Sequence, residues 1–143
     1  MTSKKTILIV DDHPLLREGL KSIIARDPRF EVIGEAGNGQ ECLQVAKECK
    51  PDLVLLDISL PDTNGIILTR TLQRLLPEIR VIIVSMHAKA NSITEAFQSG
   101  AMGYVSKDSA TETLLEGLEA VSRGDYFLDS AISSQVVITP VIK

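Results

Sequence analysis

Aromatic residues and long apolar runs are both scarce in this chain. Aromatics make up 3% of its 143 residues and tryptophan is absent, so the core must be built from aliphatic side chains. No apolar run approaches the roughly 20 residues that a membrane-spanning helix needs. The N-terminus leads directly into a predicted strand, with no targeting segment before it. We therefore expect a cytoplasmic protein that does not contact a membrane.

Cysteine and positive charge are limited too. The two cysteines, Cys42 and Cys49, are seven positions apart on one predicted helix, too far for a disulfide, and no zinc-ligand spacing occurs. The formal net charge is −4 and no basic stripe is visible. Direct binding of nucleic acid by this chain alone is therefore not expected.

Strand and helix patterns alternate five times along the chain. Short apolar runs bounded by turn residues predict buried parallel strands, and apolar residues at helical spacing predict the helices between them. Such alternation indicates an α/β fold, a five-stranded parallel sheet with helices on both faces. The predicted strands are 6–10, 31–36, 52–56, 80–84 and 103–105, and the predicted helices are 14–26, 41–49, 65–76, 90–98 and 109–123.

The end of the chain has a different pattern. Residues 1–124 form the predicted domain, and residues 125–143 are interpreted as a C-terminal linker or tail. Within that segment, Asp129 or Ser130 is expected to cap a short helical turn. The apolar stretch 136–143 has no partner that the sequence identifies.

Polar residues follow four of the predicted strands. Asp11 and Asp12 follow the first, Asp57 the third, Ser85 the fourth and Lys107 the fifth. In open α/β sheets, ligands bind at the edge where the carboxyl ends of the strands meet. Clustered carboxylates suit a hard divalent cation such as Mg²⁺, and a carboxylate beside such a cation can attack a phosphoryl group. Lys107 and Ser85 would then neutralise and hold the phosphoryl oxygens.

Each of these residues has a structural alternative. Asp12 could cap the first helix, Ser85 could be a strand-end turn residue, and Lys107 could be an ordinary solvated lysine. Because all of them are predicted at the same edge of the sheet, the interpretation as a cation and phosphoryl site is favoured.

The motifs that carry this set resemble a known family. They are the stretch 7–14 ending Asp11-Asp12-His13-Pro14, the stretch from Asp57 through Pro61 to Gly65, the stretch 84–87, and Gly103-Tyr104 with Lys107. Over about residues 5–124, the chain closely resembles the receiver domain of bacterial two-component response regulators, of the NarL/FixJ type with LuxR-type output. The resemblance implies a doubly wound, flavodoxin-like or CheY-like sheet with strand order 2-1-3-4-5.

The resemblance also implies roles for individual residues. Asp57 would be the phosphoacceptor, with Mg²⁺ (or Mn²⁺) held by Asp12, Asp57 and the Ser59 carbonyl and with Asp11 close by or acting through water. The phosphoryl oxygens would be bound by the Ser59 and Met86 amides, the Ser85 hydroxyl and the Lys107 amine.

Further residues are implied to transmit or tune the signal. Ser85 and Tyr104 would form the switch pair, Tyr104 following as phosphate draws Ser85 inward, while Ser59 and His87 would tune the lifetime of the phosphate. The alternatives are an edge-strand aromatic for Tyr104 and a solvated loop residue for His87. His13 is interpreted as a helix-start residue rather than as a ligand or a phosphodonor.

The implied function is a phosphorylation-dependent signalling switch, not an enzyme, that catalyses only its own phosphorylation and dephosphorylation. Its partners would be a sensor histidine kinase, docking around residues 14–17, and a second copy of the chain. In the subfamily the output is a helix-turn-helix domain that controls transcription, and this chain contains none, so it is an excised receiver or a single-domain regulator.

Three other functions would each require different residues. A phosphatase with a phosphoaspartate intermediate would need a second Asp two residues after Asp57, where Ser59 stands. A nucleotide-binding domain would need a glycine-rich phosphate loop, which is absent. A degenerate receiver acting as a scaffold would have lost the acidic pair that Asp11 and Asp12 form here.

Overall fold

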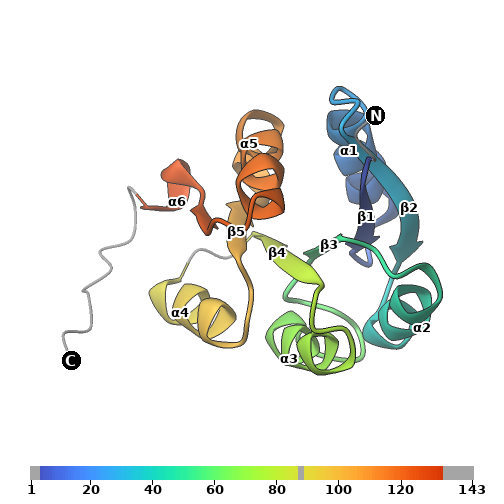
Figure 1. The fold of residues 1–143 in the computed structure, drawn as a ribbon. Coiled ribbons are helices and arrows are strands. Elements are labelled where there is room, and N and C mark those ends of the chain that lie inside the picture. The colour runs from blue at the N-terminus through green and yellow to red at the C-terminus, as the bar shows by residue number, and fades with distance from the viewer. Residues whose placement is uncertain (1–3, 87–88, 134–143) are drawn as a thin grey trace.

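A parallel sheet of six strands forms the centre of the molecule. The computed structural model describes residues 4–86 and 89–133, and its strands are ordered β2-β1-β3-β4-β5-β6 (Figure 1). All neighbouring strands are parallel. The strands are β1 (Lys5–Val10), β2 (Phe30–Ala36), β3 (Leu53–Leu56), β4 (Arg80–Ser85), β5 (Gly103–Ser106) and β6 (Phe127–Leu128).

Helices cover both faces of this sheet, as the alternating pattern predicts. Helices α1 and α5 contact each other on one face, while α2, α3 and α4 follow one another across the other face (Figure 1). The helices are α1 (Pro14–Ile24), α2 (Gly39–Cys49), α3 (Gly65–Leu75), α4 (Ala90–Gln98), α5 (Ala110–Ser122) and α6 (Ser130–Ser133), with a 3₁₀ turn at Lys107–Ser109.

The alternation of side chains along each strand divides the core in two. In β1, Leu8 and Val10 pack with the α2, α3 and α4 side, whereas Ile7 and Ile9 pack with the α1 and α5 side. All four are fully buried. Because both faces are covered, the strand reads as a continuous apolar run rather than as alternating apolar and polar residues.

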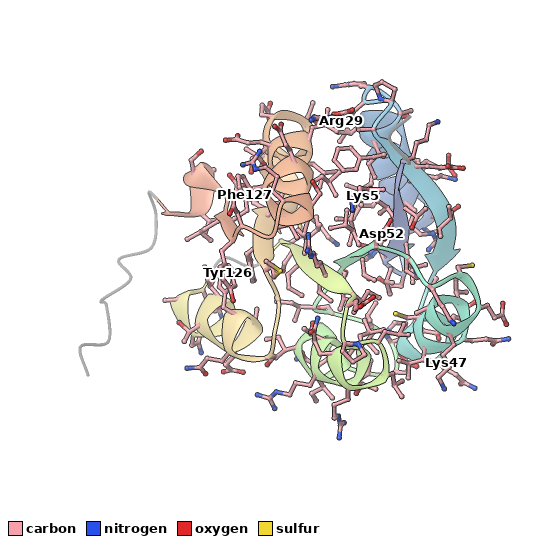
Figure 2. The ribbon with its side chains drawn as sticks, in the orientation of Figure 1. Lys5, Arg29, Lys47, Asp52, Tyr126 and Phe127 are labelled. Atoms are coloured by element: carbon pink, nitrogen blue, oxygen red, sulfur yellow. The ribbon has the colours of Figure 1, made fainter. Side chains whose placement is uncertain are left out.

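The sixth strand corrects the expectation of five. Strand β6 extends the predicted order 2-1-3-4-5 by pairing with β5, Gly103 opposite Phe127 and Tyr104 opposite Leu128. It lies within residues 125–143, which the sequence assigns to a linker or tail. The Phe127 ring contacts α5 at Gly117 (Figure 2). The centroid of the Tyr126 ring lies 6.1 Å from the centroid of the Phe97 ring in α4, in an edge-to-face arrangement. A strand of two residues is too short to produce an alternating pattern in the sequence.

The helix ends follow the turn chemistry of the sequence. Asn38 and Asn64 cap α2 and α3, their side chains accepting the N–H groups of Glu41 and Ile66. Lys50 ends α2 in the left-handed conformation, with φ of 46°.

Asp129 joins the last described segment, residues 129–133, to the sheet. Its fully buried carboxylate accepts hydrogen bonds from the Ser106 N–H at 3.0 Å, the Thr113 hydroxyl at 3.2 Å and the Ser109 hydroxyl. Its other oxygen accepts the Ala131 N–H at 3.0 Å and so caps α6, which confirms the predicted short helical turn. The buried charge is thus held by donors from β5, α5 and α6.

Both cysteines are free thiols, as their spacing predicts. Cys42 is buried and Cys49 is exposed; burial raises the pKa of Cys42 to about 12, so that thiol is unreactive. None of the helices in the described part of the chain has the length and apolar character needed to span a bilayer.

The Asp129 carboxylate should contribute strongly to stability. We expect Asp129→Ala to lower the free energy of unfolding by about 2 to 4 kcal/mol, because it leaves buried donors without an acceptor. Asp125→Ala is the control: this carboxylate, 62% exposed, pairs with Arg123 and with no other described residue, and its loss should cost at most about 1 kcal/mol. Urea unfolding of both variants checks this, and equal losses would contradict the assigned role of Asp129.

Candidate functional site

Two buried carboxylates and one amine meet where β1, β3 and β5 end. Asp11 is 2% exposed and Asp57 is 4% exposed. The Lys107 amine lies 2.9 Å from Asp11 Oδ2 and 3.0 Å from Asp57 Oδ2. The structure thus brings together three of the residues that the sequence places at this edge.

The buried position sets the protonation behaviour of this group. Burial raises the pKa of Asp57 above its usual value and the charge of Asp11 adds to the rise, whereas Lys107 opposes it. Burial disfavours the charged form of Lys107, but its hydrogen bonds and charge interactions with Asp11 and Asp57 outweigh that and raise the pKa of the amine. Lys107 therefore stays a cation between two carboxylates that repel each other.

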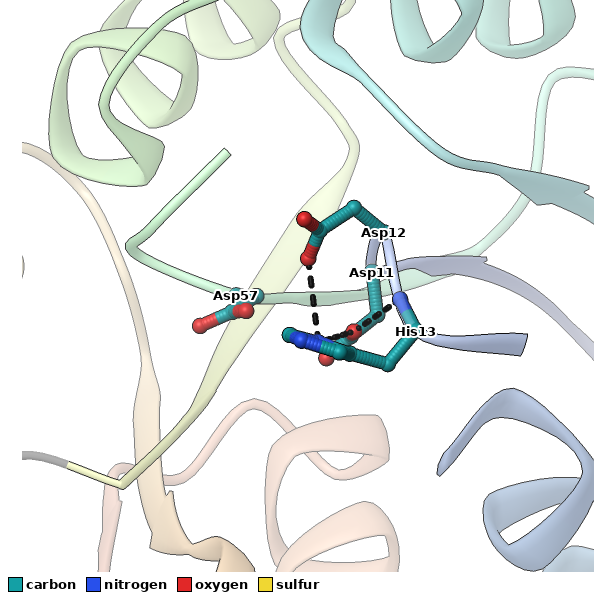
Figure 3. Close-up of side chains that lie close together, drawn as sticks. All are labelled: Asp11, Asp12, His13 and Asp57. Carbon is teal, nitrogen blue, oxygen red and sulfur yellow. Dashed lines mark hydrogen bonds and ion pairs between the residues drawn. The ribbon is translucent and has the colours of Figure 1, made fainter. Parts of the chain in front are cut away.

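Asp12 and His13 complete the acidic edge (Figure 3). His13 Nδ1 lies 3.0 Å from Asp11 Oδ1 and 3.0 Å from Asp12 Oδ1, and the His13 backbone N–H donates to Asp11 Oδ1 at 2.8 Å. His13 does precede α1 as its N-cap residue, as the sequence indicates. The placement of its ring against both carboxylates went unpredicted, and its position directly after the acidic pair is the only sequence signal for it.

The donor set fits a divalent cation. Asp11, Asp12, His13 and Asp57 each offer one ligand atom, and these atoms lie within 4.8 Å of one another. When ionised, the three carboxylates outnumber the single positive charge of Lys107 and leave two negative charges unbalanced. A hard dication with oxygen ligands would balance them.

The loop after Asp57 is held close to it. The Ser59 N–H donates to Asp57 Oδ1 at 3.3 Å. Ser59 also pairs with Asn64 in an isolated antiparallel β-bridge. The Gly65 N–H donates to the Ile58 carbonyl at 2.7 Å, and a Cβ on Gly65 would lie 2.3 Å from the Asp57 carbonyl oxygen. Only glycine therefore lets α3 begin directly against the backbone of Asp57.

Ser85 and Tyr104 lie on neighbouring strands, β4 and β5, and both are buried. Burial raises the pKa of Tyr104, and the charge of Asp57 adds to the rise, while a side-chain hydrogen bond with Ser85 opposes it. Because β6 covers β5, Tyr104 is not the edge-strand aromatic of the alternative interpretation. Met86 is exposed, and His87 lies outside the described residues.

Two supporting contacts were not predicted. The Arg17 guanidinium donates to the Asp11 carbonyl and, at 3.0 Å, to Glu35 of β2. The Asp62 carboxylate accepts the N–H groups of Gly39 and Gln40 at 2.7 and 3.1 Å, which lowers the pKa of that carboxyl. These contacts join the acidic loops to α1 and α2, and no local sequence pattern specifies such long-range pairs.

Comparison with known proteins identifies the family. The model of the response regulator receiver domain matches residues 7–119. This chain belongs to the response regulator receiver domain family. The receiver domain is 36% identical over 128 residues to the nitrate/nitrite response regulator protein NarL of Escherichia coli K12, covering 90% of this chain and 59% of that protein.

Other relatives support the same family. The receiver domain is 32% identical to the transcriptional regulatory protein DegU of Brevibacillus brevis, covering 94% of this chain and 57% of DegU. It resembles the crystal structure of a LuxR-family two-component response regulator from Aurantimonas sp. SI85-9A1 with a TM-score of 0.88 and 35% identity, covering 92% of this chain and 94% of that one. The receiver domain is of the NarL/FixJ type, and it spans less than two thirds of NarL and DegU.

The close approach at Gly65 should make it intolerant of a side chain. We expect Gly65→Ala to lower the free energy of unfolding by about 1 to 3 kcal/mol, because Cβ meets a backbone oxygen that cannot rotate away. Gly19→Ala is the matched control, since a Cβ there meets nothing within 4 Å and alanine should stabilise α1 by about 0.5 to 1 kcal/mol. Urea unfolding distinguishes the two, and a neutral Gly65→Ala would contradict the close approach.

The buried charge of Asp57 should reduce stability at neutral pH. A carboxyl whose pKa is raised by folding contributes stability below its unfolded pKa and loses it as pH rises through the folded value. We therefore expect Asp57→Asn to be more stable than the wild type at pH 7, with the difference shrinking as pH falls and the wild-type carboxyl becomes protonated.

Chemical unfolding between pH 4 and 7 measures this difference, the range being set by the usual carboxyl pKa of about 4. The control is Asp108→Asn, which changes an exposed carboxylate in the 3₁₀ turn next to Lys107 and should alter stability little at any of these pH values. A variant less stable than the wild type at pH 7 would show that the Lys107 pairing outweighs the burial.

Proposed function

We propose that this receiver domain accepts a phosphoryl group from a sensor histidine kinase on Asp57, with Mg²⁺ or Mn²⁺ bound at the acidic edge. The observation that supports this best is the pairing of the buried Asp57 carboxylate with Lys107, beside Asp11 and Asp12. In a longer parent protein in the cytoplasm, the phosphorylation state would control a DNA-binding output domain and transcription.

The transfer uses groups already in place. An Asp57 carboxylate oxygen forms the new O–P bond as the N–P bond of the kinase phosphohistidine breaks, and the kinase imidazole leaves with that electron pair. Asp11, Asp12, Asp57 and the Ser59 carbonyl would hold the cation, which neutralises charge on the phosphoryl oxygens. Lys107, the Ser85 hydroxyl and the Ser59 and Met86 amides would bind those oxygens.

The Ser85–Tyr104 pair would report the phosphoryl group to the rest of the domain. Tyr104 is fully buried on β5, which pairs with the strand that carries Ser85. Phosphorylation would exchange the hydrogen bond between Ser85 and Tyr104 for one between Ser85 and a phosphoryl oxygen. This biases the surface around α4 and β5 between two states. Tuning of the phosphate lifetime by Ser59 and His87 stays a prediction.

The kinase would dock at the start of α1. Leu15 is 88% exposed there, directly beside the acidic edge in the sequence, which suits an apolar contact with a partner helix. The homodimer that the resemblance suggests also stays a prediction.

Incubation with acetyl phosphate and Mg²⁺, followed by intact mass measurement, tests the acceptor. We expect the wild type to gain one phosphoryl group, removable by hydroxylamine as an acyl phosphate is, and Asp57→Asn to gain none. An adduct retained by Asp57→Asn would show that another residue is the acceptor. No adduct in the wild type, together with no Mg²⁺ binding, would favour a scaffold role.

A further inference from the structure

The ring of His13 lies where a ligand of the proposed cation would be. Its Nδ1 is 3.0 Å from an oxygen of Asp11 and 3.0 Å from an oxygen of Asp12. Figure 3 shows the ring beside both carboxylates. Its side chain is 68% exposed and makes no capping hydrogen bond to α1. The ring therefore serves neither the core nor the helix end.

We infer that His13 is a nitrogen ligand of the cation site, and that it makes the site favour borderline transition-metal dications such as Co²⁺, Ni²⁺ or Zn²⁺ more than carboxylates alone would. This inference rests on the proposed function, because it adds a ligand to the same site.

The spacing of the donor atoms suits one shared cation. Bonds from a small dication to nitrogen or oxygen are about 2.1 Å long, so neighbouring donors around an octahedral cation are about 3.0 Å apart. Nδ1 stands at that separation from both carboxylate oxygens. One cation can therefore touch all three atoms with little movement of the side chains.

The two oxygens of Asp11 face different partners. Oδ2 contacts the Lys107 amine, whereas Oδ1 contacts the His13 ring and backbone N–H. A cation on the Oδ1 side would thus leave the ion pair with Lys107 in place.

The chain also fixes the backbone from which the ring projects. Pro14 follows His13 and disfavours the helical conformation for it. His13 accordingly has φ −103° and ψ 107°, in the extended region. Without a cation, Nδ1 is placed to donate a proton to the carboxylate oxygens, which only accept. With a cation bound, the ring would carry its proton on Nε2, and the lone pair of Nδ1 would face the cation.

The type of ligand atom determines which cations are bound more tightly. Mg²⁺ is bound by oxygen and keeps several waters, and it gains little from imidazole. Imidazole suits Fe, Co, Ni, Cu and Zn, for which affinity generally rises along the Irving–Williams order. A His13 ligand should therefore raise the affinity for these ions selectively.

Titration calorimetry of the whole chain with Co²⁺ and, separately, with Mg²⁺ tests the selectivity. We expect His13→Ala to weaken Co²⁺ binding by about tenfold or more and to leave Mg²⁺ binding within about twofold. His13→Gln, which keeps a polar side chain without imidazole, should behave like His13→Ala. The only other histidine in the sequence is His87, so His87→Ala is the matched control and should bind both ions as the wild type does.

Proton NMR of the Co²⁺ complex supplies a readout that a structural role would not change. An imidazole N–H resonance shifted by the paramagnetic ion is expected in the wild type and in His87→Ala, and not in His13→Ala. Co²⁺ binding without that resonance, its loss in His87→Ala, or an equal loss of Mg²⁺ and Co²⁺ affinity in His13→Ala would each overturn the ligand role of His13 while leaving Asp57 as the acceptor. Failure of the wild type to bind either ion would overturn the proposed cation-dependent function as well.

Discussion

The ion pairs of Lys107 with Asp11 and Asp57 are the interaction on which the arrangement of the site depends most. They place one cation between two buried carboxylates that would otherwise repel each other at short range. Removing charge from water is costly, and the pair recovers that cost only with close geometry. The sheet provides this geometry, because parallel strands β1, β3 and β5 all end at the same edge. The aliphatic strands therefore do more than form a core: they hold charges at fixed separations.

The loops around this edge are tied to the scaffold by hydrogen bonds. Arg17, which lies on α1, donates a hydrogen bond to the Asp11 carbonyl. Asp62, in the loop after β3, accepts a hydrogen bond from the first N–H of α2. Gly65 allows α3 to begin against the backbone of Asp57. Such contacts restrict the position of the Asp57 carboxylate, and the proposed phosphoryl transfer would gain rate from this positioning.

The sequence predicts the repeating elements well because buried strands and amphipathic helices have strong local patterns. It also predicts that Asp11, Asp57 and Lys107 meet, since strand ends share an edge. It does not predict β6, because Phe127 and Leu128 are too few to form a pattern and depend on pairing with β5. Nor does it predict the direction of the His13 ring, which is set by the neighbouring carboxylates and not by helix propensity.

Asp129 shows how one residue can be partly predicted. Its capping of α6 follows from its residue type, whereas its burial follows from donors far away in the sequence. Two of those donors, Ser106 and Ser109, flank Lys107. Besides the pairing of β5 with β6, this buried carboxylate therefore joins the segment that carries Lys107 to the segment that begins α6. Because a buried carboxylate that loses its donors costs free energy, a displacement of the Lys107 segment away from Asp129 would be opposed by these hydrogen bonds.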